Sequence, residues 1–284
     1  MKFIESFKID YNIDQMKYSK YYIAFLDVLG FKQLVSSKKK VDRNKIATYF
    51  ALIKEITKNL KRIDSKKNIG SIVISDSVIL SIPFGDNEHD QVRNLRQLCV
   101  AIGIIQYNLS MENVWIRGAI SCGEAYFNPI EYAIVGPAYI QAYLLQENIA
   151  KYPRVIIDHK VIKELGLKSA QDFINKVNVQ ALYQQFANWR TNILFDWADS
   201  DLYPEKLTQD IALFIDYLSP MLVKENKDDA FKIIKNIQRN IYSSTEIYEK
   251  YRWVANYLIY MFGIRRDDDR YEHNREMLEF VVKL

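Results

Sequence analysis

Two aspartates are placed where they could hold a divalent metal ion. Asp27 ends one apolar run, and Asp76 lies in the turn between two other apolar runs. If the strand of residues 21–27 neighbours that of residues 69–75, both carboxylates reach the same edge of one sheet. Carboxylate and carbonyl oxygens are the ligands that Mg²⁺ and Mn²⁺ prefer. The sequence therefore predicts a metal site formed by Asp27 and Asp76.

The turn that follows Asp27 is suited to a phosphate group. Its residues 28–31 read Val-Leu-Gly-Phe, and a glycine lets the backbone approach a ligand closely. The backbone amides near Gly30 and Phe31 are therefore predicted to bind phosphate oxygens. A single acidic turn residue is more often structural, because Ser-Asp-Ser turns form for local hydrogen-bonding reasons. The sequence has no histidine cluster, nucleophile elbow or Walker-type glycine loop that would compete as a site.

The hydrophobic pattern predicts the strands and helices that position these residues. Short apolar runs predict strands over 21–27, 69–75, 77–83, 114–120, 124–127 and 155–158. Apolar positions at three- and four-residue steps predict helices over 46–63 and 92–102, and a third that Gly136-Pro137 opens. The order β-α-β-β-α-β-β-α-β is typical of an α+β fold with a ferredoxin-like (palm) sheet and helices packed on one face.

The composition indicates a globular chain of one or two domains. Hydrophobic residues make up 49% and charged residues 26%, which excludes a disordered or collagen-like chain. The net charge of +4 is too small to argue for nucleic acid, and no stable nucleic-acid partner is expected. Because the pattern becomes mainly helical after about residue 165, we expect a first domain at residues 1–165 and a helical extension packed on it at 166–284. The acidic run at residues 267–269 is interpreted as a solvated turn.

Three features of the sequence favour the cytoplasm. Residues 1–20 are charged throughout, which is unlike a signal peptide. No uncharged apolar run approaches the roughly 18–20 residues needed to cross a bilayer, so no membrane partner is expected. Cys99 and Cys122 form neither a metal-spaced cluster nor a disulfide framework. They are predicted to pack as small buried side chains in a reducing compartment.

Four segments, in this order, resemble the catalytic domain of the class III nucleotidyl cyclases. They are FLDVLGF, SIVISDSVILSIP, VWIRGAISCGEAYF and AIVGPAYIQAYLLQ, and the match covers about residues 20–158. In that family the aspartates of the first two segments bind metal, and the turn after the first aspartate holds the triphosphate. The resemblance therefore implies that residues 1–165 form a class III cyclase-like catalytic domain.

Departures from the family pattern point to one branch of it. In purine cyclases an asparagine and an arginine on the last segment help to bind ribose and stabilise the transition state, and here Ile140 and Leu144 occupy those places. The strand at residues 69–75 has no lysine or glutamate of the kind that reads a purine. The stretch GPAYIQAYLLQENIAKYPRVIID resembles the bacterial Pycsar antiphage pyrimidine cyclases, and the later segments FIDYL and KYRWVANY resemble that family's carboxy-terminal half.

The Pycsar resemblance implies a uridylate cyclase, or less often a cytidylate cyclase. Such an enzyme converts UTP to 3′,5′-cyclic UMP and pyrophosphate, and a separate effector protein reads the product during the response to phage. The resemblance also implies two Mg²⁺ or Mn²⁺ ions per active site, bridged by Asp27 and Asp76, with the carbonyl of Val28 as a further ligand. Three alternatives stay open: a cytidylate cyclase, a purine nucleotide cyclase, and a catalytically degenerate module that binds nucleotide or a partner.

Three further residues are candidates to contact the nucleotide. The guanidinium groups of Arg117 and Arg154 offer a planar fork that fits phosphate, although a structural salt bridge or a surface charge would also explain either arginine. Tyr49 could contact the pyrimidine. It shares an apolar helix face with Ile46 and Ile53, however, and that position is typical of core packing.

The resemblance also implies a homodimer in which the neighbouring subunit completes each active site. The helix at residues 136–151 would lie near the two-fold interface. Ala138 and Ala142 would permit close backbone approach there. Tyr139, Tyr143 and Gln146 share a helix face that could lie at this interface, near the neighbour's metal site, although burial alone would also explain the two tyrosines.

Overall fold

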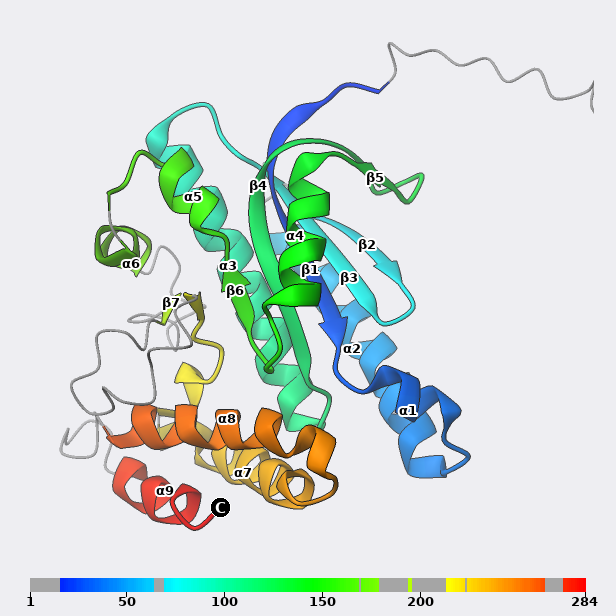
Figure 1. Ribbon diagram of the computed structural model, residues 1–284, viewed down its shortest axis with the longest axis vertical. Helices are drawn as coiled ribbons and strands as arrows, with labels where there is room; N and C mark the ends of the chain where they lie inside the picture. The colour runs from blue at the N-terminus through cyan, green and yellow to red at the C-terminus, as the bar shows by residue number, and fades with distance from the viewer. Residues whose placement is uncertain are drawn as a thin grey trace, which may run out of the picture.

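The computed structural model describes residues 16–63, 69–168, 170–178, 194–195, 213–222, 224–263 and 273–284. In chain order (Figure 1) the elements are β1 (Ser19–Val28), α1 (Phe31–Ser36), α2 (Lys40–Ile63), β2 (Gly70–Ile74), β3 (Ser77–Pro83), α3 (Glu88–Met111), β4 (Ile116–Asn128), β5 (Ala133–Val135), α4 (Pro137–Asn148), β6 (Val155–Ile157), α5 (His159–Glu164), α6 (Ala170–Asn178), β7 (Leu194–Phe195), β8 (Phe214–Ile215), the 3₁₀ helices η3 (Ser219–Leu222) and η4 (Lys224–Asn226), α7 (Lys227–Ile241), α8 (Thr245–Gly263) and α9 (His273–Val281). The acidic run at residues 267–269 lies outside the described residues.

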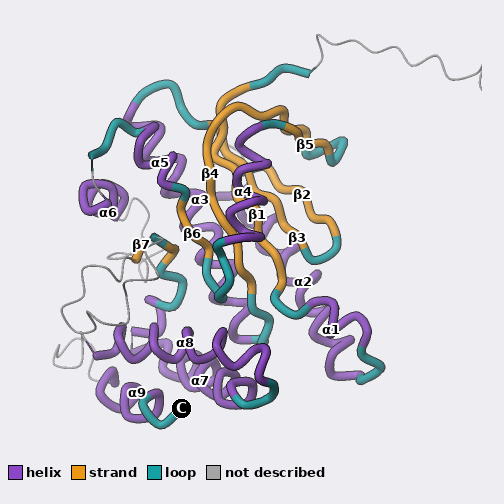
Figure 2. Tube along the Cα trace, in the orientation of Figure 1, coloured by secondary structure: helices purple, strands orange, loops and turns teal. Residues whose placement is uncertain are grey.

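A mixed sheet lies at the centre of the molecule, with the strand order β2-β3-β1-β4-β6-β8-β7 (Figure 2). The central strand β1 pairs antiparallel with β3 on one side and β4 on the other. The next pair, β4 and β6, is parallel, and β5 pairs with the end of β4. This sheet, its helices and the helical C-terminal part confirm the predicted α+β fold.

The two faces of β1 have different helical covers. Tyr22, Ala24 and Leu26 point into the main core with residues of α2 and α3. The alternate residues Ile23 and Phe25 point to the other face, where α4 packs. The sequence predicted that the helices pack on one face of the sheet. This is confirmed for α2 and α3, whereas α4 packs on the opposite face (Figure 1). Burial at every position from Tyr22 to Leu26 follows from this double cover.

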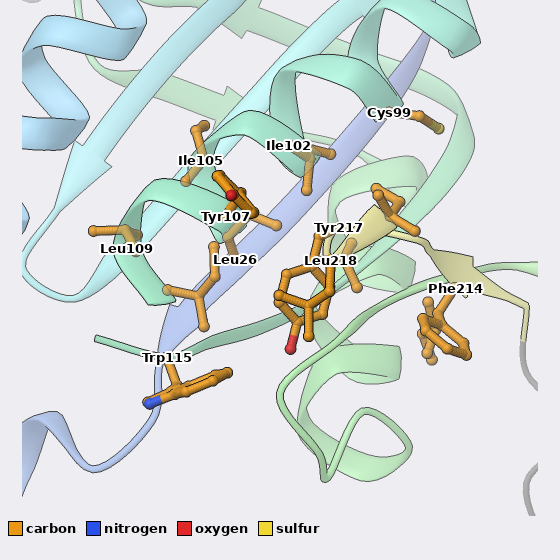
Figure 3. Packing of buried hydrophobic residues seen from close by; sticks show 14 of the residues in the cluster. Leu26, Cys99, Ile102, Ile105, Tyr107, Leu109, Trp115, Phe214, Tyr217 and Leu218 are labelled. Atoms are coloured by element: carbon orange, nitrogen blue, oxygen red, sulfur yellow. The ribbon is translucent and has the colours of Figure 1, made fainter. Parts of the chain in front are cut away.

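The main core continues into the C-terminal part of the chain. Tyr217 and Leu218 share one buried cluster with Leu26 of β1 and Ile102 of α3 (Figure 3). Cys99 is buried in the same cluster, as its apolar surroundings predicted. The helices α7, α8 and α9 pack together beside it (Figure 1). None of the helices among the described residues is both long and apolar enough to cross a membrane.

The C-terminal part also adds two strands to the sheet that the sequence pattern did not predict. Phe214 of β8 pairs with Ile156 of β6, and β7 pairs with β8. Each of these strands has two residues, which is too short for the period-two pattern that reveals a strand. The boundary at residues 165 and 166 stays a prediction.

Two details of strand pairing differ from the sequence-based expectation. Residues 114–120 and 124–127 do not form separate paired strands, because β4 runs unbroken through Ser-Cys-Gly. It stays extended there since β1 pairs with it along its whole length, from Ser19 opposite Ala125 to Val28 opposite Ile116. The strand β1 also has β3, not β2, as its neighbour on the other side.

Candidate metal and nucleotide site

The sheet brings Asp27 and Asp76 together at one edge. Asp27 lies opposite Ser77 in the β1–β3 pair, and Ser77 directly follows Asp76 in the β2–β3 turn. The backbone N–H of Val28 donates to the carbonyl of Asp76 at 3.2 Å, which ties the two segments together. Asp27 and Asp76 therefore lie at the same sheet edge, as predicted. They meet there because β3, and not β2, pairs with β1.

The carboxylate of Asp27 receives two hydrogen bonds on one oxygen. Arg117 lies directly opposite Asp27 on β4, and its Nε donates to Oδ2 of Asp27 at 3.3 Å. The amide Nε2 of Gln146, in the last turn of α4, donates to the same Oδ2 at 3.3 Å. Two side chains from different elements thus fix this carboxylate beside Asp76.

Close contact of β1 and β4 beside this pair depends on Gly118. A Cβ at this position would overlap the carbonyl oxygen of Phe25 and the side chain of Leu26. The residue next to Arg117 must therefore be glycine for the two strands to approach as they do. The adjacent pair Arg117-Gly118 thus places an arginine directly opposite Asp27.

The electrostatic environment raises the pKa of Asp27 to about 6. Burial is the largest cause, because it removes water from the charged form. Arg117 opposes this effect, whereas the nearby negative charges of Asp76 and Glu147 add to it. The protein thus does not fully stabilise the negative charge of the ionised Asp27 carboxylate, and a bound cation would supply the missing stabilisation.

The donor set fits a cation that shares its ligands with the substrate. Among the described residues, no group of three or more histidine, cysteine, aspartate or glutamate side chains could form a closed metal cage. Mg²⁺ is usually held by one or two carboxylates plus water and substrate phosphates, and does not need such a cage. Asp27 and Asp76, with the carbonyl of Val28, match this open arrangement.

A buried hydroxyl lies within electrostatic range of both aspartates. Tyr49 of α2 is 1% exposed, and its hydroxyl has no hydrogen-bond partner among the described residues. Burial, and after it the charges of Asp76 and Asp27, raise the pKa of Tyr49. The ring packs against Phe31 and Phe50, so Tyr49 combines the expected core position with a polar atom that a ligand could satisfy.

The turn after β1 has the tight backbone conformation that Gly30 indicated in the sequence. Gly30 has a φ of 74°, a left-handed conformation that other residues adopt only with strain. The N–H of Leu29 donates to the carbonyl of Trp115 at 2.8 Å, which anchors the turn to the start of β4. The side chain of Phe31 is buried, so only its backbone amide is a candidate for phosphate.

The two candidate arginines have different surroundings. Arg117 is partly exposed beside Asp27. Arg154 is buried, and its guanidinium carbon lies 5.3 Å from the ring centre of Trp253 and 5.6 Å from that of Phe214. These cation–π contacts to the C-terminal part support a structural role for Arg154.

The helix α4 presents both a buried and an exposed apolar face. Ala138 and Ala142 are fully buried against the sheet of their own chain, so they are not available for the close approach of a second subunit. Ile140 and Leu144, which stand where purine cyclases have their asparagine and arginine, are 52% and 44% exposed. Tyr143 is also exposed, with its ring edge against Phe25.

The sequence pattern did not assign Gln146 to Asp27. It placed this residue on a helix face expected at a subunit interface, whereas the side chain is buried on Asp27 of its own chain. The one available signal was a polar residue four positions after Ala142, on the stripe that starts at Ala138. A polar group on an apolar stripe indicates a specific buried partner.

Comparisons with known proteins give similarity to solved structures only. No family model matches the sequence, and no curated protein matches it. The adenylyl cyclase CyaB from P. aeruginosa is 15% identical, with a TM-score of 0.39 over 53% of this chain and 82% of that one. A bacterial light-regulated adenylyl cyclase is 12% identical, with a TM-score of 0.38 over 78% of this chain and 99% of that one.

A third solved structure is a class III adenylyl cyclase-like ATP-binding protein from Pseudomonas aeruginosa. It is 11% identical, with a TM-score of 0.39 over 81% of this chain and 60% of that one. Similarities at this level carry no conclusion about activity.

Replacing Tyr49 by phenylalanine is expected to stabilise the free protein and weaken its response to ligand. Removal of an unpartnered buried hydroxyl raises the free energy of unfolding by about 1 kcal/mol. If this hydroxyl contacts a bound ligand or its water, any rise in Tm on addition of Mn²⁺ with a nucleoside triphosphate becomes smaller. Differential scanning fluorimetry measures both effects.

Tyr22→Phe is the matched control for this experiment. The hydroxyl of Tyr22 is also buried and without a partner among the described residues. It lies five residues before Asp27 on β1, which is roughly 17 Å along an extended strand. This variant should gain stability and keep the full ligand response, and an equal ligand response in both variants would exclude Tyr49 from the site.

Proposed function

We propose that this chain is a metal-dependent pyrimidine nucleotide cyclase that converts UTP to 3′,5′-cyclic UMP and pyrophosphate. The observation that carries the proposal is the convergence of Asp27 and Asp76 at one sheet edge, next to the Gly30 turn. Two adjacent carboxylates suit divalent metal ions, and a glycine turn beside them suits the phosphates that such ions accompany. The Pycsar-like segments of the sequence support the pyrimidine base.

The proposed reaction is an intramolecular displacement at phosphorus. The ribose 3′-oxygen bonds to the α-phosphorus and gives up its proton to solvent water. The bond from that phosphorus to the oxygen bridging the α- and β-phosphates breaks, and pyrophosphate leaves with that oxygen. No covalent intermediate with the protein is needed, so positioning and charge neutralisation supply most of the acceleration.

The residues of the site have distinct proposed roles in this reaction. Asp27, Asp76 and the carbonyl of Val28 would hold two Mg²⁺ or Mn²⁺ ions. When bound, such ions lower the pKa of the 3′-hydroxyl and neutralise charge on the triphosphate. The amides of Gly30 and Phe31 bind phosphate oxygens in this proposal. Arg117 holds Asp27, and its partial exposure also allows it to meet phosphate.

The biological setting follows from the same resemblance. The product would be a second messenger in antiphage defence, made in the cytoplasm and read by a separate effector protein. The enzyme would act as a homodimer, with the exposed Ile140, Tyr143 and Leu144 of α4 buried against the partner subunit. An exposed apolar stripe on a helix beside the site supports an interface there.

A competition experiment tests the activity and the choice of base. The purified chain is incubated with equal concentrations of ATP, GTP, CTP and UTP and with Mn²⁺, and the cyclic products are resolved by mass. We expect cyclic UMP as the main product. A pocket closed around one ring excludes purines by steric clash. Uracil and cytosine differ in a hydrogen-bonding group at the 4-position, so separating them requires a polar partner in the pocket.

Each other outcome overturns a defined part of the proposal. Cyclic CMP as the main product would exclude only the preference for uracil. Cyclic AMP or cyclic GMP would exclude the pyrimidine branch. Nucleotide-induced stabilisation without any cyclic product would instead favour a module that binds nucleotide without turnover. Ile140 and Leu144 are compatible with that function, because they replace the asparagine and arginine that assist catalysis in purine cyclases.

A further inference from the structure

A single polar side chain interrupts the buried face of α4. Ala138, Ala142 and Gln146 are spaced by four residues and lie on one stripe of the helix. The two alanines pack on apolar residues of the sheet, whereas Gln146 is 1% exposed and donates its amide to Asp27. Burying an amide is unfavourable unless it is hydrogen-bonded, so this contact accounts for the position of Gln146.

The two donors to Asp27 leave one carboxylate oxygen without a donor. Arg117 Nε and Gln146 Nε2 both contact Oδ2, each at 3.3 Å. No described residue donates to Oδ1. The donors come from β4 and α4, which approach the carboxylate from a neighbouring strand and from the helix packed on the sheet. Together they restrict rotation of the carboxylate more than either contact would separately.

We propose that Gln146 is a positioning residue that holds Oδ2 of Asp27 and keeps Oδ1 available to a metal ion. This inference rests on the proposed function, because it gives Asp27 a metal to bind. Groups that hydrogen-bond a ligating carboxylate set its orientation, and their loss typically lowers metal affinity by about 10–100-fold. Gln146 acts through Asp27 and does not itself touch the substrate.

The amide suits this task better than a charged donor would. Arg117 already places one positive charge beside Asp27, and a second cation would compete with the metal for the same carboxylate. A neutral amide donates a hydrogen bond while leaving the net negative charge of the site unchanged. The position therefore calls for a donor of glutamine length without charge.

The test measures Mn²⁺ binding directly, in the full chain and without nucleotide. Free Mn²⁺ is followed by its electron paramagnetic resonance signal in the parent, in Gln146→Met and in Gln141→Met. Methionine has a similar length and volume but no donor, and Gln141 is a half-buried glutamine on the same helix. We expect the dissociation constant for Mn²⁺ to rise by about 10–100-fold in Gln146→Met and to stay at the parent value in Gln141→Met.

Enzyme kinetics give a second readout that a purely structural role would not produce. In Gln146→Met the Mn²⁺ concentration for half-maximal cyclisation should rise, while kcat at saturating Mn²⁺ returns close to that of the parent. Gln146→Leu, which also lacks the donor, gives the same comparison if Gln146→Met does not fold. Parent-like Mn²⁺ binding in a folded variant would overturn the positioning role.

Failure of the proposed function would look different from failure of this inference. If the parent itself bound no Mn²⁺, the metal site of the proposed cyclase would be wrong, and the role of Gln146 would be wrong with it. If the parent bound Mn²⁺ through Asp27 and the loss of Gln146 changed nothing, only the positioning role would be wrong. Asp27→Asn in the same titration separates these two results.

Discussion

Asparagine in place of Asp27 or Asp76 is expected to reduce cyclisation of UTP by at least about 1,000-fold while leaving the fold intact. Metal ions at a reacting phosphate contribute several kcal/mol, and 1,000-fold corresponds to about 4 kcal/mol. Each substitution removes one of the two carboxylates that converge at the sheet edge. Asn keeps the shape of the side chain, so the loss reports charge and metal binding.

The same Asp27→Asn variant is expected to unfold at higher temperature than the parent at neutral pH. The pKa of Asp27 is raised to about 6, so ionisation of this carboxylate costs the folded state free energy. The cost is absent well below pH 4, where the carboxyl is protonated in both folded and unfolded protein. It grows between about pH 4, where the unfolded chain ionises, and about pH 6, where the folded protein ionises, and it is constant at higher pH. Allowing for partial exposure, it amounts to about 1–3 kcal/mol.

Activity assays and thermal unfolding from pH 4 to pH 8 test these two expectations together. The stability difference between Asp27→Asn and the parent should be near zero at pH 4 and largest above pH 7. Asp86→Asn, an exposed aspartate in the loop after β3, is the control and should match the parent in both assays. Parent-like turnover by Asp27→Asn or Asp76→Asn at limiting Mg²⁺ would exclude the metal assignment.

Glutamate in place of Leu144 is expected to convert an active dimer into an inactive monomer. Leu144 is exposed on the face of α4 that the proposed interface covers, next to Ile140 and Tyr143. Burying an unpaired carboxylate at an apolar interface costs about 3–5 kcal/mol. The dimer dissociation constant should therefore rise by at least about 100-fold. Activity should fall with it if the partner subunit completes the site.

Analytical ultracentrifugation across a range of protein concentrations, with activity measured on the same samples, distinguishes the possible results. Val282→Glu places the same charge on an exposed apolar residue near the C-terminus and should leave assembly unchanged. If the parent were a monomer with full activity at nanomolar concentration, the interface on α4 would be wrong. If Leu144→Glu stayed dimeric, the interface would have to use another surface.

Local pattern was sufficient to predict the elements that carry the two aspartates. The apolar run before Asp27 and the runs that flank Asp76 appear as β1, β2 and β3, with boundaries within two residues of those expected. The Gly-Pro step at residues 136–137 opens α4, as expected of a proline in a first helical turn. Such features depend on the backbone preferences of a few neighbouring residues, so they can be predicted from the local sequence.

Pairing between distant segments could not be predicted in the same way. The metal site was predicted on the condition that β2 neighbours β1, whereas β3 takes that place and still brings Asp76 to the site. The strands β7 and β8 extend the sheet with two residues each. Neither result has a local signal, because strand order depends on which apolar faces can be buried together.

The sequence by itself determined which residues end the strands at the site: Asp27, Asp76 and the glycine turn that begins beside them. Only the tertiary structure decided what surrounds them. Gln146 reaches Asp27 across 119 residues of chain. Arg154, a candidate for phosphate, is buried instead against aromatic rings of β8 and α8. The physical reason is that a strand end or a turn follows from local propensity, whereas the partner of a buried polar group depends on which distant elements pack around it.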